Sequence, residues 1–333
     1  MPKEIKEKEV GDKLAAVMEE INEKYGENSV MRMDDEHTFK IETFKTDCLG
    51  LDYILGCGGI PKGRILEIYG MQSSGKTSLS FFLASQVQKA GGVCVWIDAE
   101  ACISSDYATS LGVDMDKLVV SQPDHGEAAL DIIEKMSRAN VDLIVVDSVA
   151  SLVPKKELEG EVGDKEQMAI QARMLSRGLR RLTMALSKSN TTVLFINQLR
   201  AKIGGYGYGP TKETTGGNAL RFYSSIRIEV SRVKTLKDKD DKSYGYTMKM
   251  HAVKNKCAPP DRSSELDFVF GKGFDFDGEI IDLGEKMGVI TRSGNTLSFG
   301  DIKLGVGVDQ ARKKIAEDKK IHEDIKGEIN KKL

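Results

Sequence analysis

The segment between residues 65 and 89 places a strand-length apolar run, a glycine-containing loop and a helical pattern directly one after another. Ile65–Tyr69 is the apolar run, residues 70–77 read Gly-Met-Gln-Ser-Ser-Gly-Lys-Thr, and Thr77–Lys89 has helical spacing. The loop matches G-x-x-x-x-G-K-[ST], and a strand before it and a helix after it are the context that this motif requires. A chance match in a chain of this length has a probability of about one in a hundred. The sequence therefore predicts a P-loop fold.

In a P-loop, glycines let backbone N–H groups close around phosphates, the lysine reaches the outer phosphates and the last hydroxyl binds magnesium. We therefore predict that the chain binds a nucleoside triphosphate, ATP with Mg²⁺, and that Lys76 and Thr77 have these two roles. The predicted nucleotide-binding residues of the loop are Gly70, Met71, Gln72, Ser73, Ser74, Gly75, Lys76, Thr77 and Ser78.

Short apolar runs that end in polar residues alternate with helical patterns after Arg64. The runs are Ile65–Tyr69, Val93–Ile97, Leu143–Val146 and Val193–Ile196, and the helical patterns are Thr77–Lys89, Glu127–Arg138 and Gln167–Ser187. This alternation predicts βαβ units, and therefore an α/β fold with a mostly parallel, twisted sheet that is covered on both faces. In such sheets ligands bind beyond the carboxyl ends of the strands.

Both ends of the chain differ from this pattern. Asp12–Tyr25 has apolar residues at helical spacing with Gly26 as a stop, and Phe39–Phe44 alternates like a half-buried strand. After about Gly273 short apolar pieces alternate with glycine turns, and a Lys-rich helical segment covers Gln310–Lys332. We therefore expect an N-terminal helix with a linker strand (1–45), the ATPase core (46–273) and a small α+β C-terminal domain (274–333).

Composition excludes several classes of protein. A hydrophobic content of 40%, a charged content of 30% and a net charge of −2 are typical of a globular protein, so that nucleic-acid binding would need a local basic surface. The N-terminus is charged rather than apolar, and the longest apolar runs are strand-length, which argues against a secretory signal and a membrane span. The scattered cysteines lack C-x-x-C spacing and the histidines lie far apart, so we expect reduced thiols, a cytoplasmic location and no zinc site.

Carboxylates follow two of the apolar runs. Asp147 ends the run 143–146 and is predicted to support the magnesium shell; its alternative role is to cap the next helix. Asp98-Ala99-Glu100 follows the run 93–97, and hydrolysis of ATP needs a carboxylate that orients the attacking water. Glu100 is the candidate for that role, whereas Asp98, nearer the strand, is expected to be structural.

Polar and basic residues follow in the second half of the core. Asn197-Gln198 leads into the glycine-rich segment 204–217, which we expect to be an irregular, mobile loop; Gln198 is either a γ-phosphate sensor or a polar strand end. A basic stripe on the helical pattern 167–187 suits a nucleic-acid backbone, with a solvated face as the alternative. Lys254 and Lys256 would point to the same side of a strand, and by themselves indicate only a surface pair. The stripe consists of Arg173, Arg177, Arg180 and Arg181.

Several long strings resemble the RecA family of recombinases, from the N-terminal helix to about Asp282. The strings are Leu66-Glu67-Ile68-Tyr69-Gly70 with Ser73-Ser74-Gly75-Lys76-Thr77, Ile97-Asp98-Ala99-Glu100, Val145-Val146-Asp147-Ser148-Val149-Ala150, Glu159-Gly160-Glu161-Val162-Gly163-Asp164, Phe195-Ile196-Asn197-Gln198, Thr214-Thr215-Gly216-Gly217-Asn218-Ala219-Leu220 and Val253-Lys254-Asn255-Lys256. The resemblance implies a RecA fold and a DNA-dependent ATPase that forms helical homo-oligomeric filaments on single-stranded DNA. Such filaments pair and exchange strands with duplex DNA in recombination, repair and the SOS response.

The resemblance also implies roles for single residues. The implied catalytic residues are Glu100, Lys76, Gln198, Lys254 and Lys256, of which the two later lysines reach across to a neighbour's ATP. Tyr107 would stack on the adenine, and the magnesium ligands would be Thr77 and Asp147. The N-terminal helix, the strand near Ile41 and Phe222 would serve polymerisation. The implied DNA-binding residues, in two loops at 159–168 and 199–215 and beside them, are Met168, Arg173, Arg180, Arg200, Ile203, Thr215, Gly216, Gly217 and Asn218.

The chain departs from the bacterial pattern of this family at several points. Gln72 replaces a Glu near the phosphates, Ser104 replaces an Asp near the adenine, and both DNA loops are one residue longer. The sequence ends in Lys331-Lys332-Leu333 without an acidic tail, which predicts easier access to duplex DNA. These features fit a bacterial or a phage-encoded relative. The alternative functions are another RecA-fold DNA motor such as a ring helicase, and a non-catalytic DNA-coating scaffold.

Overall fold

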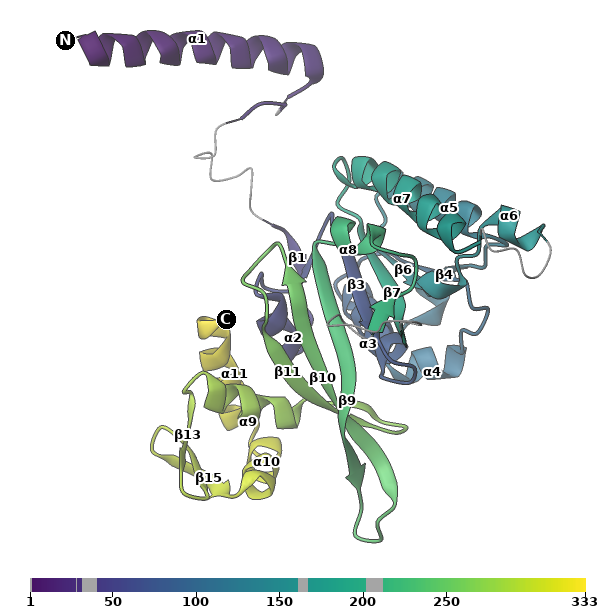
Figure 1. Ribbon diagram of the computed structural model, residues 1–333. Helices are drawn as coiled ribbons and strands as arrows, with labels where there is room; N and C mark the ends of the chain where they lie inside the picture. Colours follow the sequence, from purple (N-terminus) through teal and green to yellow (C-terminus); the bar gives the residue numbers. More distant parts are fainter. Residues whose placement is uncertain (1, 28, 32–40, 161–166, 202–211) are drawn as a thin grey trace, which may run out of the picture. The chain divides into compact units, whose positions relative to one another are not determined.

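The computed structural model describes residues 2–27, 29–31, 41–160, 167–201 and 212–333 (Figure 1). The chain divides into two compact units, Met1–Glu42 and Thr43–Leu333. In the first unit, helix α1 covers Pro2–Tyr25 and therefore begins ten residues before the predicted helix. Residues 2–11 carry alternating lysines and glutamates, which favour a helix without giving it an apolar stripe. Nowhere in the described part of the chain is a helix long and apolar enough to cross a bilayer.

The second unit is built on one large sheet, and its strand order confirms the predicted α/β fold. The order is β12-β11-β10-β9-β3-β7-β6-β4-β5, with β8 paired to β7. Strands β9, β3, β7, β6, β4 and β5 are parallel to one another, whereas β10, β11 and β12 extend the sheet as antiparallel strands. The strands are β3 (Ile65–Gly70), β4 (Cys94–Asp98), β5 (Leu118–Ser121), β6 (Leu143–Asp147), β7 (Thr192–Ala201), β8 (Lys212–Thr214), β9 (Ile226–Lys237), β10 (Ser243–Asn255), β11 (Ser263–Val269) and β12 (Gly273–Asp275).

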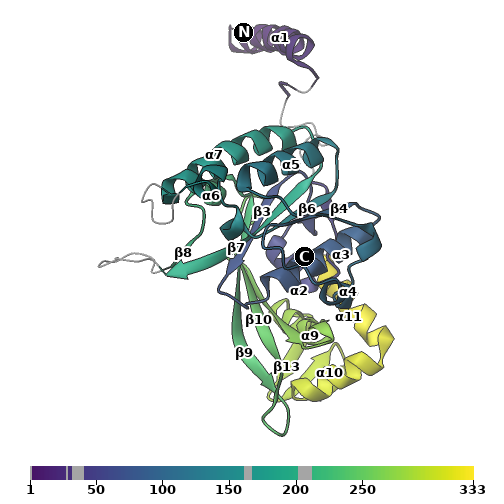
Figure 2. The same ribbon diagram turned by 90° about the vertical axis from the view of Figure 1, so that its right-hand side faces the viewer.

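Helices cover both faces of this sheet, and each face has its own apolar core. Along β6, Leu143 and Val145 face a core that includes helix α3, whereas Ile144 and Val146 face a core formed with α5 and α7. Figures 1 and 2 show α5 and α7 side by side on one face of the sheet. The helices of this region are α2 (Leu49–Leu55), α3 (Lys76–Lys89), α4 (Ser105–Ser110), α5 (Gly126–Arg138), α6 (Lys155–Leu158), α7 (Gln167–Leu186) and α8 (Ala219–Tyr223).

Two local predictions differ from the structure. The strand expected at 39–44 is confirmed only as β1 (Thr43–Phe44), which pairs with β2 (Ile60–Pro61); residues 39 and 40 lie outside the described residues. The expectation of an irregular segment at 204–217 is wrong for β8, because this short strand pairs with the end of β7. Such pairing depends on a distant partner, which a local glycine-rich composition does not reveal.

The C-terminal part of the second unit has a third apolar core. Helices α9 (Asp277–Lys286), α10 (Val308–Glu317) and α11 (Lys319–Lys332) pack with the three-stranded sheet β13 (Ile290–Ser293), β14 (Thr296–Phe299) and β15 (Ile302–Val306). The predicted helical segment 310–332 is two helices, since Asp318 caps α11 by accepting hydrogen bonds from the backbone N–H groups of Lys320 and Ile321.

A buried carboxylate connects this part to the start of α2. Glu279 of α9 accepts hydrogen bonds from the backbone N–H groups of Leu49 and Gly50, both at 3.0 Å, and from the thiol of Cys48. Burial raises the pKa of Glu279 to about 7, although the hydrogen bonds from Gly50, Cys48 and Leu49 oppose the shift. Burial therefore favours the protonated form of this carboxyl, compared with the same group in water.

This raised pKa predicts a dependence of stability on pH. Because the folded pKa exceeds the unfolded one, the contribution of Glu279 is fully present below the unfolded value and is lost as pH rises through about 7. Between pH 4.5 and 8 the loss is about 3 kcal/mol. In urea unfolding, Glu279→Gln should remove this part of the pH slope, whereas Glu317→Gln at an exposed site of α10 should keep it. Parallel slopes for all three proteins would contradict the assignment.

Candidate nucleotide and DNA site

The P-loop lies between β3 and α3, as predicted. Gly70 is required at the end of β3, because a Cβ there would collide with the carbonyl oxygen of Val230. The ammonium of Lys76 donates a hydrogen bond to the carbonyl of Met71 at 2.9 Å, and burial lowers its pKa against the opposing charges of Asp147 and Glu100. The hydroxyl of Ser74 is buried and has no hydrogen-bond partner among the described residues. An unpartnered buried oxygen and a buried ammonium in one loop fit an anionic ligand that would satisfy both.

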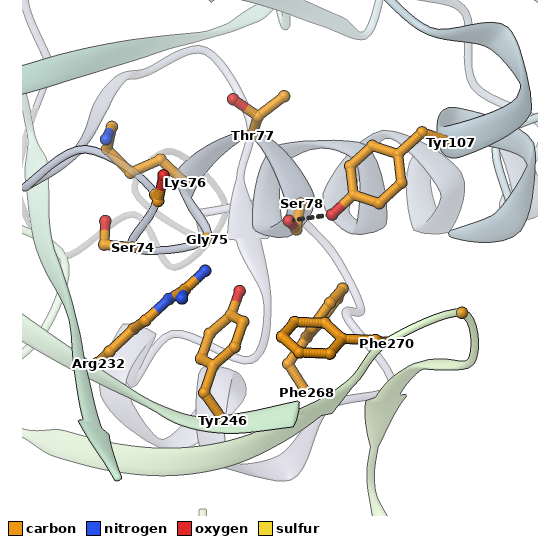
Figure 3. A pocket seen from close by; sticks show the side chains of 12 residues that line it. Ser74, Gly75, Lys76, Thr77, Ser78, Tyr107, Arg232, Tyr246, Phe268 and Phe270 are labelled. Atoms are coloured by element: carbon orange, nitrogen blue, oxygen red, sulfur yellow. Dashed lines mark hydrogen bonds between the residues drawn. The ribbon is translucent and has the colours of Figure 1, made fainter. Parts of the chain in front are cut away.

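A cavity of about 310 Å³ opens beside this loop (Figure 3). Residues 73–78 form one wall, and Tyr107 of α4 stands at its rim, where its hydroxyl hydrogen-bonds the hydroxyl of Ser78 at 2.6 Å. The opposite wall comes from β9, β10 and the turn after β11: the guanidinium of Arg232 lies 3.8 Å from the ring centroid of Tyr246, and Phe270 lies beside them. An aromatic wall next to a phosphate-binding loop has the composition that a purine nucleotide needs.

The two predicted magnesium ligands, Thr77 and Asp147, are in direct contact. The hydroxyl of Thr77 donates to Asp147 Oδ2 at 3.0 Å. Burial raises the pKa of Asp147 to about 6, the charge of Glu100 adds to the shift, and the bond from Thr77 opposes it. A carboxylate held in a buried, negative site is one that a divalent cation would stabilise. The pair therefore fits Mg²⁺, and the alternative role of Asp147 as a helix cap is not seen, because the following short helix shows no side-chain cap bond.

Glu100 follows the end of β4, at the same edge of the sheet as Asp147. Its Oε1 accepts hydrogen bonds from the hydroxyl of Ser148 and, at 3.2 Å, from the side-chain amide of Gln198. Asp98, by contrast, accepts bonds from the backbone N–H groups of Cys102 and Ile103 and therefore shapes the turn. The structure thus places an exposed carboxylate in contact with the predicted sensor.

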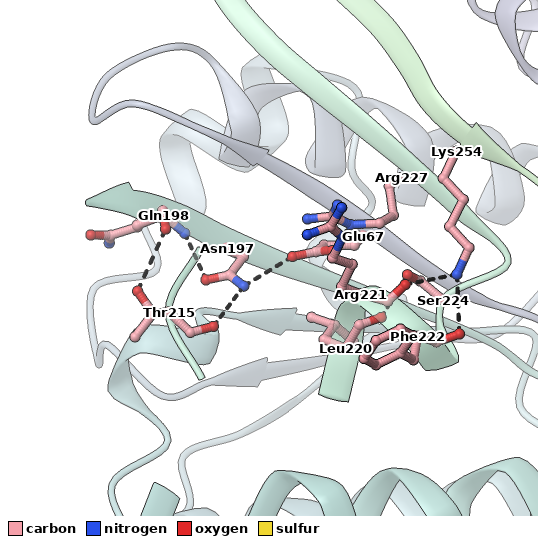
Figure 4. Close-up of polar contacts among 10 residues, drawn as sticks. All are labelled: Glu67, Asn197, Gln198, Thr215, Leu220, Arg221, Phe222, Ser224, Arg227 and Lys254. Atoms are coloured by element: carbon pink, nitrogen blue, oxygen red, sulfur yellow. Dashed lines mark hydrogen bonds and ion pairs between the residues drawn. The ribbon is translucent and has the colours of Figure 1, made fainter. Parts of the chain in front are cut away.

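The side chain of Asn197 connects this edge to Thr215, the last residue of the predicted second DNA loop (Figure 4). Its amide nitrogen donates to Glu67 Oε1 at 2.9 Å and to the carbonyl of Thr215 at 3.0 Å, and its oxygen accepts from the backbone N–H of Gln198 at 2.8 Å. Glu67, in turn, is fully buried and forms an ion pair with Arg227. A movement of Gln198 is therefore connected to Thr215 through the buried side chain of Asn197, which Glu67 holds in place.

Lys254 and Lys256 lie at the end of β10. Lys254 donates to the carbonyls of Arg221 and Phe222 at 2.7 and 3.0 Å, and burial together with the charges of Lys256 and Arg227 lowers its pKa to about 8. The expectation that both lysines follow a regular strand alternation is wrong, because the register shifts between Ala252 and Lys254 and β10 ends before Lys256. In the described part of this chain, Lys254 has no hydrogen bond to its own P-loop.

The basic stripe on α7 is in part neutralised. Arg181 pairs with Glu134 at 2.6 Å and with Asp131 at 3.8 Å, so the alternative of a solvated face with acidic partners describes Arg181. The acids come from α5, which only the packing of two helices brings within reach. Arg173 and Arg180 are exposed on α7.

The remaining predicted DNA-binding residues lie next to, or within, the sequence ranges that the structure does not describe. Gly216, with φ of +86°, packs so closely that a Cβ there would collide with Leu175, and Gly217 follows with φ of +72°. Asn218 is the N-cap residue before α8, and Arg200 is exposed on β7. Ile203 lies outside the described residues, as do 161–166 of the first loop, and of Met168 only the helical backbone is described.

Sequence reasoning missed several residues of the site. Arg232, Tyr246 and Phe270 come from β9, β10 and the turn after β11, far along the chain from the P-loop, and their local patterns give no hint of a pocket. Glu67 did leave a signal, since a carboxylate inside an otherwise apolar strand requires a partner. The position of Arg227 in the neighbouring strand could not be read from that signal.

Comparisons with known proteins agree with this site. The family model described as the RecA N-terminal domain matches residues 12–275, and that of the RecA C-terminal domain matches residues 278–333. Protein RecA of Sulfurimonas denitrificans is 49% identical over 317 residues, which are 95% of this chain and 91% of that protein. Protein RecA of Helicobacter pylori is 48% identical over 94% of this chain and 90% of its own length. Protein RecA of Nautilia profundicola is 49% identical over 96% and 90%.

The buried ion pair predicts an effect on stability. Glu67→Gln keeps the shape of the side chain but leaves the guanidinium of Arg227 buried without its carboxylate, which should lower the free energy of unfolding by about 3–5 kcal/mol. Asp131→Asn, at an exposed pair with Lys135, is the matched control and should leave urea unfolding unchanged. Equal stability of wild type and Glu67→Gln would show that Arg227 finds another partner.

Proposed function

The chain belongs to the RecA family and is a DNA-dependent ATPase and recombinase in recombination and DNA repair, and on this premise we propose how its residues divide the work. ATP binds in the cavity beside the P-loop, single-stranded DNA binds along the two loops, and subunits assemble into a helical filament. Family membership favours this function over a ring helicase or a passive scaffold. The contact of Gln198 with Glu100 carries the proposal, because it joins the segment that leads to DNA to the carboxylate that serves hydrolysis.

The P-loop has the groups that a triphosphate requires. Lys76 gives up its bond to the carbonyl of Met71 and binds the outer phosphates, while Ser74 supplies a buried hydroxyl. Tyr107 lies where it can stack on a base, and Arg232 lies on the opposite wall. Thr77 and Asp147 would hold Mg²⁺, which would neutralise charge on the phosphate oxygens. Gln72 is exposed in this loop, so its replacement of a Glu affects charge rather than packing.

Glu100 is the group that orients the attacking water. It is exposed, which gives water access, and its orientation is fixed by the hydroxyl of Ser148. The amide of Gln198 occupies the same Oε1, so that a γ-phosphate which draws Gln198 away would free this oxygen for water. Binding of ATP and release of the carboxylate are then one event.

The second DNA loop responds to the same event. Gln198 ends the buried part of β7, and Asn197 connects its backbone to Thr215, where the loop returns to the sheet. The glycines at 216 and 217 let this return approach α7 closely, which presents backbone N–H groups to a phosphodiester chain. Arg173, Arg180 and Arg200 add positive charge beside it, so that affinity for DNA should depend on salt.

The ATP site is completed by a second copy of the chain. Lys254, with a pKa lowered to about 8, is bound to two backbone carbonyls and to no carboxylate of the described residues. It lies at the opposite side of the Glu67–Arg227 pair from Gln198 (Figure 4). A lysine without a carboxylate partner is available to a phosphate of the neighbouring subunit. The exposed ring of Phe222 next to it supplies apolar contact area for the same interface.

The decisive experiment measures ATP hydrolysis with and without single-stranded DNA. Wild type should hydrolyse ATP only with DNA. Lys254→Ala should lose turnover by about a hundredfold, because a cation at the transferred phosphate is removed. Binding of a fluorescent ATP analogue to the DNA-free protein should change little, since the P-loop remains intact.

Lys188→Ala is the matched control, because Lys188 is exposed beyond the end of α7, at the edge of the sheet away from the P-loop. Its turnover should equal that of wild type. Turnover that ignores DNA would contradict the proposed coupling, and equal losses of turnover and nucleotide binding in Lys254→Ala would contradict a role in the neighbour's site.

A further inference from the structure

An arginine ends a row of apolar side chains on β9. Ile226, Ile228 and Val230 are buried in the apolar core that includes α3. Side chains two residues apart on a strand face the same side, so Arg232 is the next position of this row. At this position the row leaves the core and reaches the nucleotide cavity, which Arg232 lines. A cation thus stands where the pattern of the strand would place another apolar residue.

The pairing of β9 with β3 brings Arg232 to the P-loop. Val230 lies opposite Gly70 in the parallel register of the two strands, and the close approach of their backbones leaves no room for a Cβ on Gly70. The P-loop begins at Gly70, whereas β9 continues beyond Val230. Figure 3 shows the guanidinium of Arg232 pointing toward Ser74 and Gly75 across the cavity.

A β-bulge follows Arg232 directly. On β10, Met248 lies opposite Arg232 and Thr247 lies opposite Lys234, so that Val233 is an extra residue of β9. A bulge increases the local twist and changes the direction of the side chains next to it, and bulges are common beside binding sites. The irregular register of this strand pair therefore occurs at the edge of the nucleotide cavity.

The ring of Tyr246 supports the guanidinium of Arg232. The guanidinium carbon lies 3.8 Å from the ring centroid, and no carboxylate of the described residues forms an ion pair with Arg232. Tyr246 is itself fixed, because it is buried and packs against Phe268 with ring centroids 5.3 Å apart. A Cβ on Gly75 would lie 2.7 Å from its hydroxyl oxygen. Stacking uses the face of a guanidinium and leaves the N–H donors at its edge available to an anion.

The cavity has a cationic end and an aromatic end. In Figure 3, Lys76, Ser74 and Arg232 lie toward one side, and Tyr107 and Phe270 lie toward the other. Among the described residues that line the cavity, the charged ones are Lys76 and Arg232, and both are cations. A nucleotide has the same polarity, with phosphates at one end and a base at the other.

We propose that Arg232 is a second phosphate-binding cation of the nucleotide site and that the ring of Tyr246 positions it. Lys76 comes from the P-loop and Arg232 from the opposite wall, so the phosphate chain is bound from both sides. A guanidinium can donate to two phosphate oxygens at once, which an ammonium does less well. Because this role depends on the proposed binding of ATP in the cavity, we test it by nucleotide binding rather than by turnover.

The test is isothermal titration calorimetry of the full-length, DNA-free protein with ADP and Mg²⁺. Arg232→Gln keeps most of the side chain but removes its charge, and it should raise the dissociation constant for ADP about tenfold. Arg232→Lys should recover part of this loss. Lys234→Gln makes the same change of charge two residues further along β9, at another exposed position, and should bind ADP like the wild type.

A double-mutant cycle tests the positioning by Tyr246. Tyr246→Leu removes the ring and should raise the dissociation constant for ADP about threefold. In a chain that already carries Arg232→Gln, the same change should have almost no further effect, because the guanidinium that the ring supports is absent. Additive losses would contradict the positioning role of Tyr246.

Three further results would overturn the role of Arg232. Equal ADP affinity of the wild type and Arg232→Gln would show that Lys76 and the P-loop suffice. Equal losses in Arg232→Gln and Lys234→Gln would show a general effect of surface charge. A wild type that does not bind ADP would contradict the proposed nucleotide site itself, and the role of Arg232 with it.

Discussion

The parallel pairing of β3 with β7 and of β6 with β4 is the constraint on which the site depends. In this register Gly70 lies opposite Gln198, and Asp147 lies opposite Asp98. The carboxyl ends of these strands therefore meet at one edge, where a phosphate-binding loop, a carboxylate and an amide can face one ligand. A shift of the register by one residue in any of these strand pairs would point the polar side chains at the strand ends toward the apolar cores.

Two buried carboxylates show how differently the fold treats charge. Glu67 has a guanidinium partner and an amide, and it connects β3 to the strands on both sides. Glu279 accepts hydrogen bonds from two backbone N–H groups and a thiol, and burial raises the pKa of its carboxyl to about 7. The first joins strands within the ATPase sheet, and the second joins the C-terminal helices to α2. An apolar residue could fill either position. It would lack the directional hydrogen bonds by which these carboxylates fix how the neighbouring elements align.

Much of the core was predictable because its signals are local. The strand, loop and helix at 65–89 and the carboxylate at Asp147 follow from patterns within a few residues. The properties that depend on distant partners were not predictable: Arg181 is neutralised by α5, β8 pairs with β7, and Tyr246 forms a wall of the nucleotide cavity. The roles of Lys254 and Lys256 came from family resemblance alone, since their sequence pattern is that of a surface pair. The structure adds that Lys254 is half-buried and bound to carbonyls.

A site shared between subunits is the central claim of this account, and mixing two inactive proteins tests it most directly. Lys76→Ala lacks a working P-loop but keeps Lys254, whereas Lys254→Ala has the opposite defect. In a randomly mixed filament, about a quarter of the interfaces would combine an intact P-loop with an intact Lys254 from the neighbour. Equimolar mixing on single-stranded DNA should therefore restore about a quarter of wild-type ATP turnover. Turnover that stays at the mean of the two separate proteins would contradict a shared site.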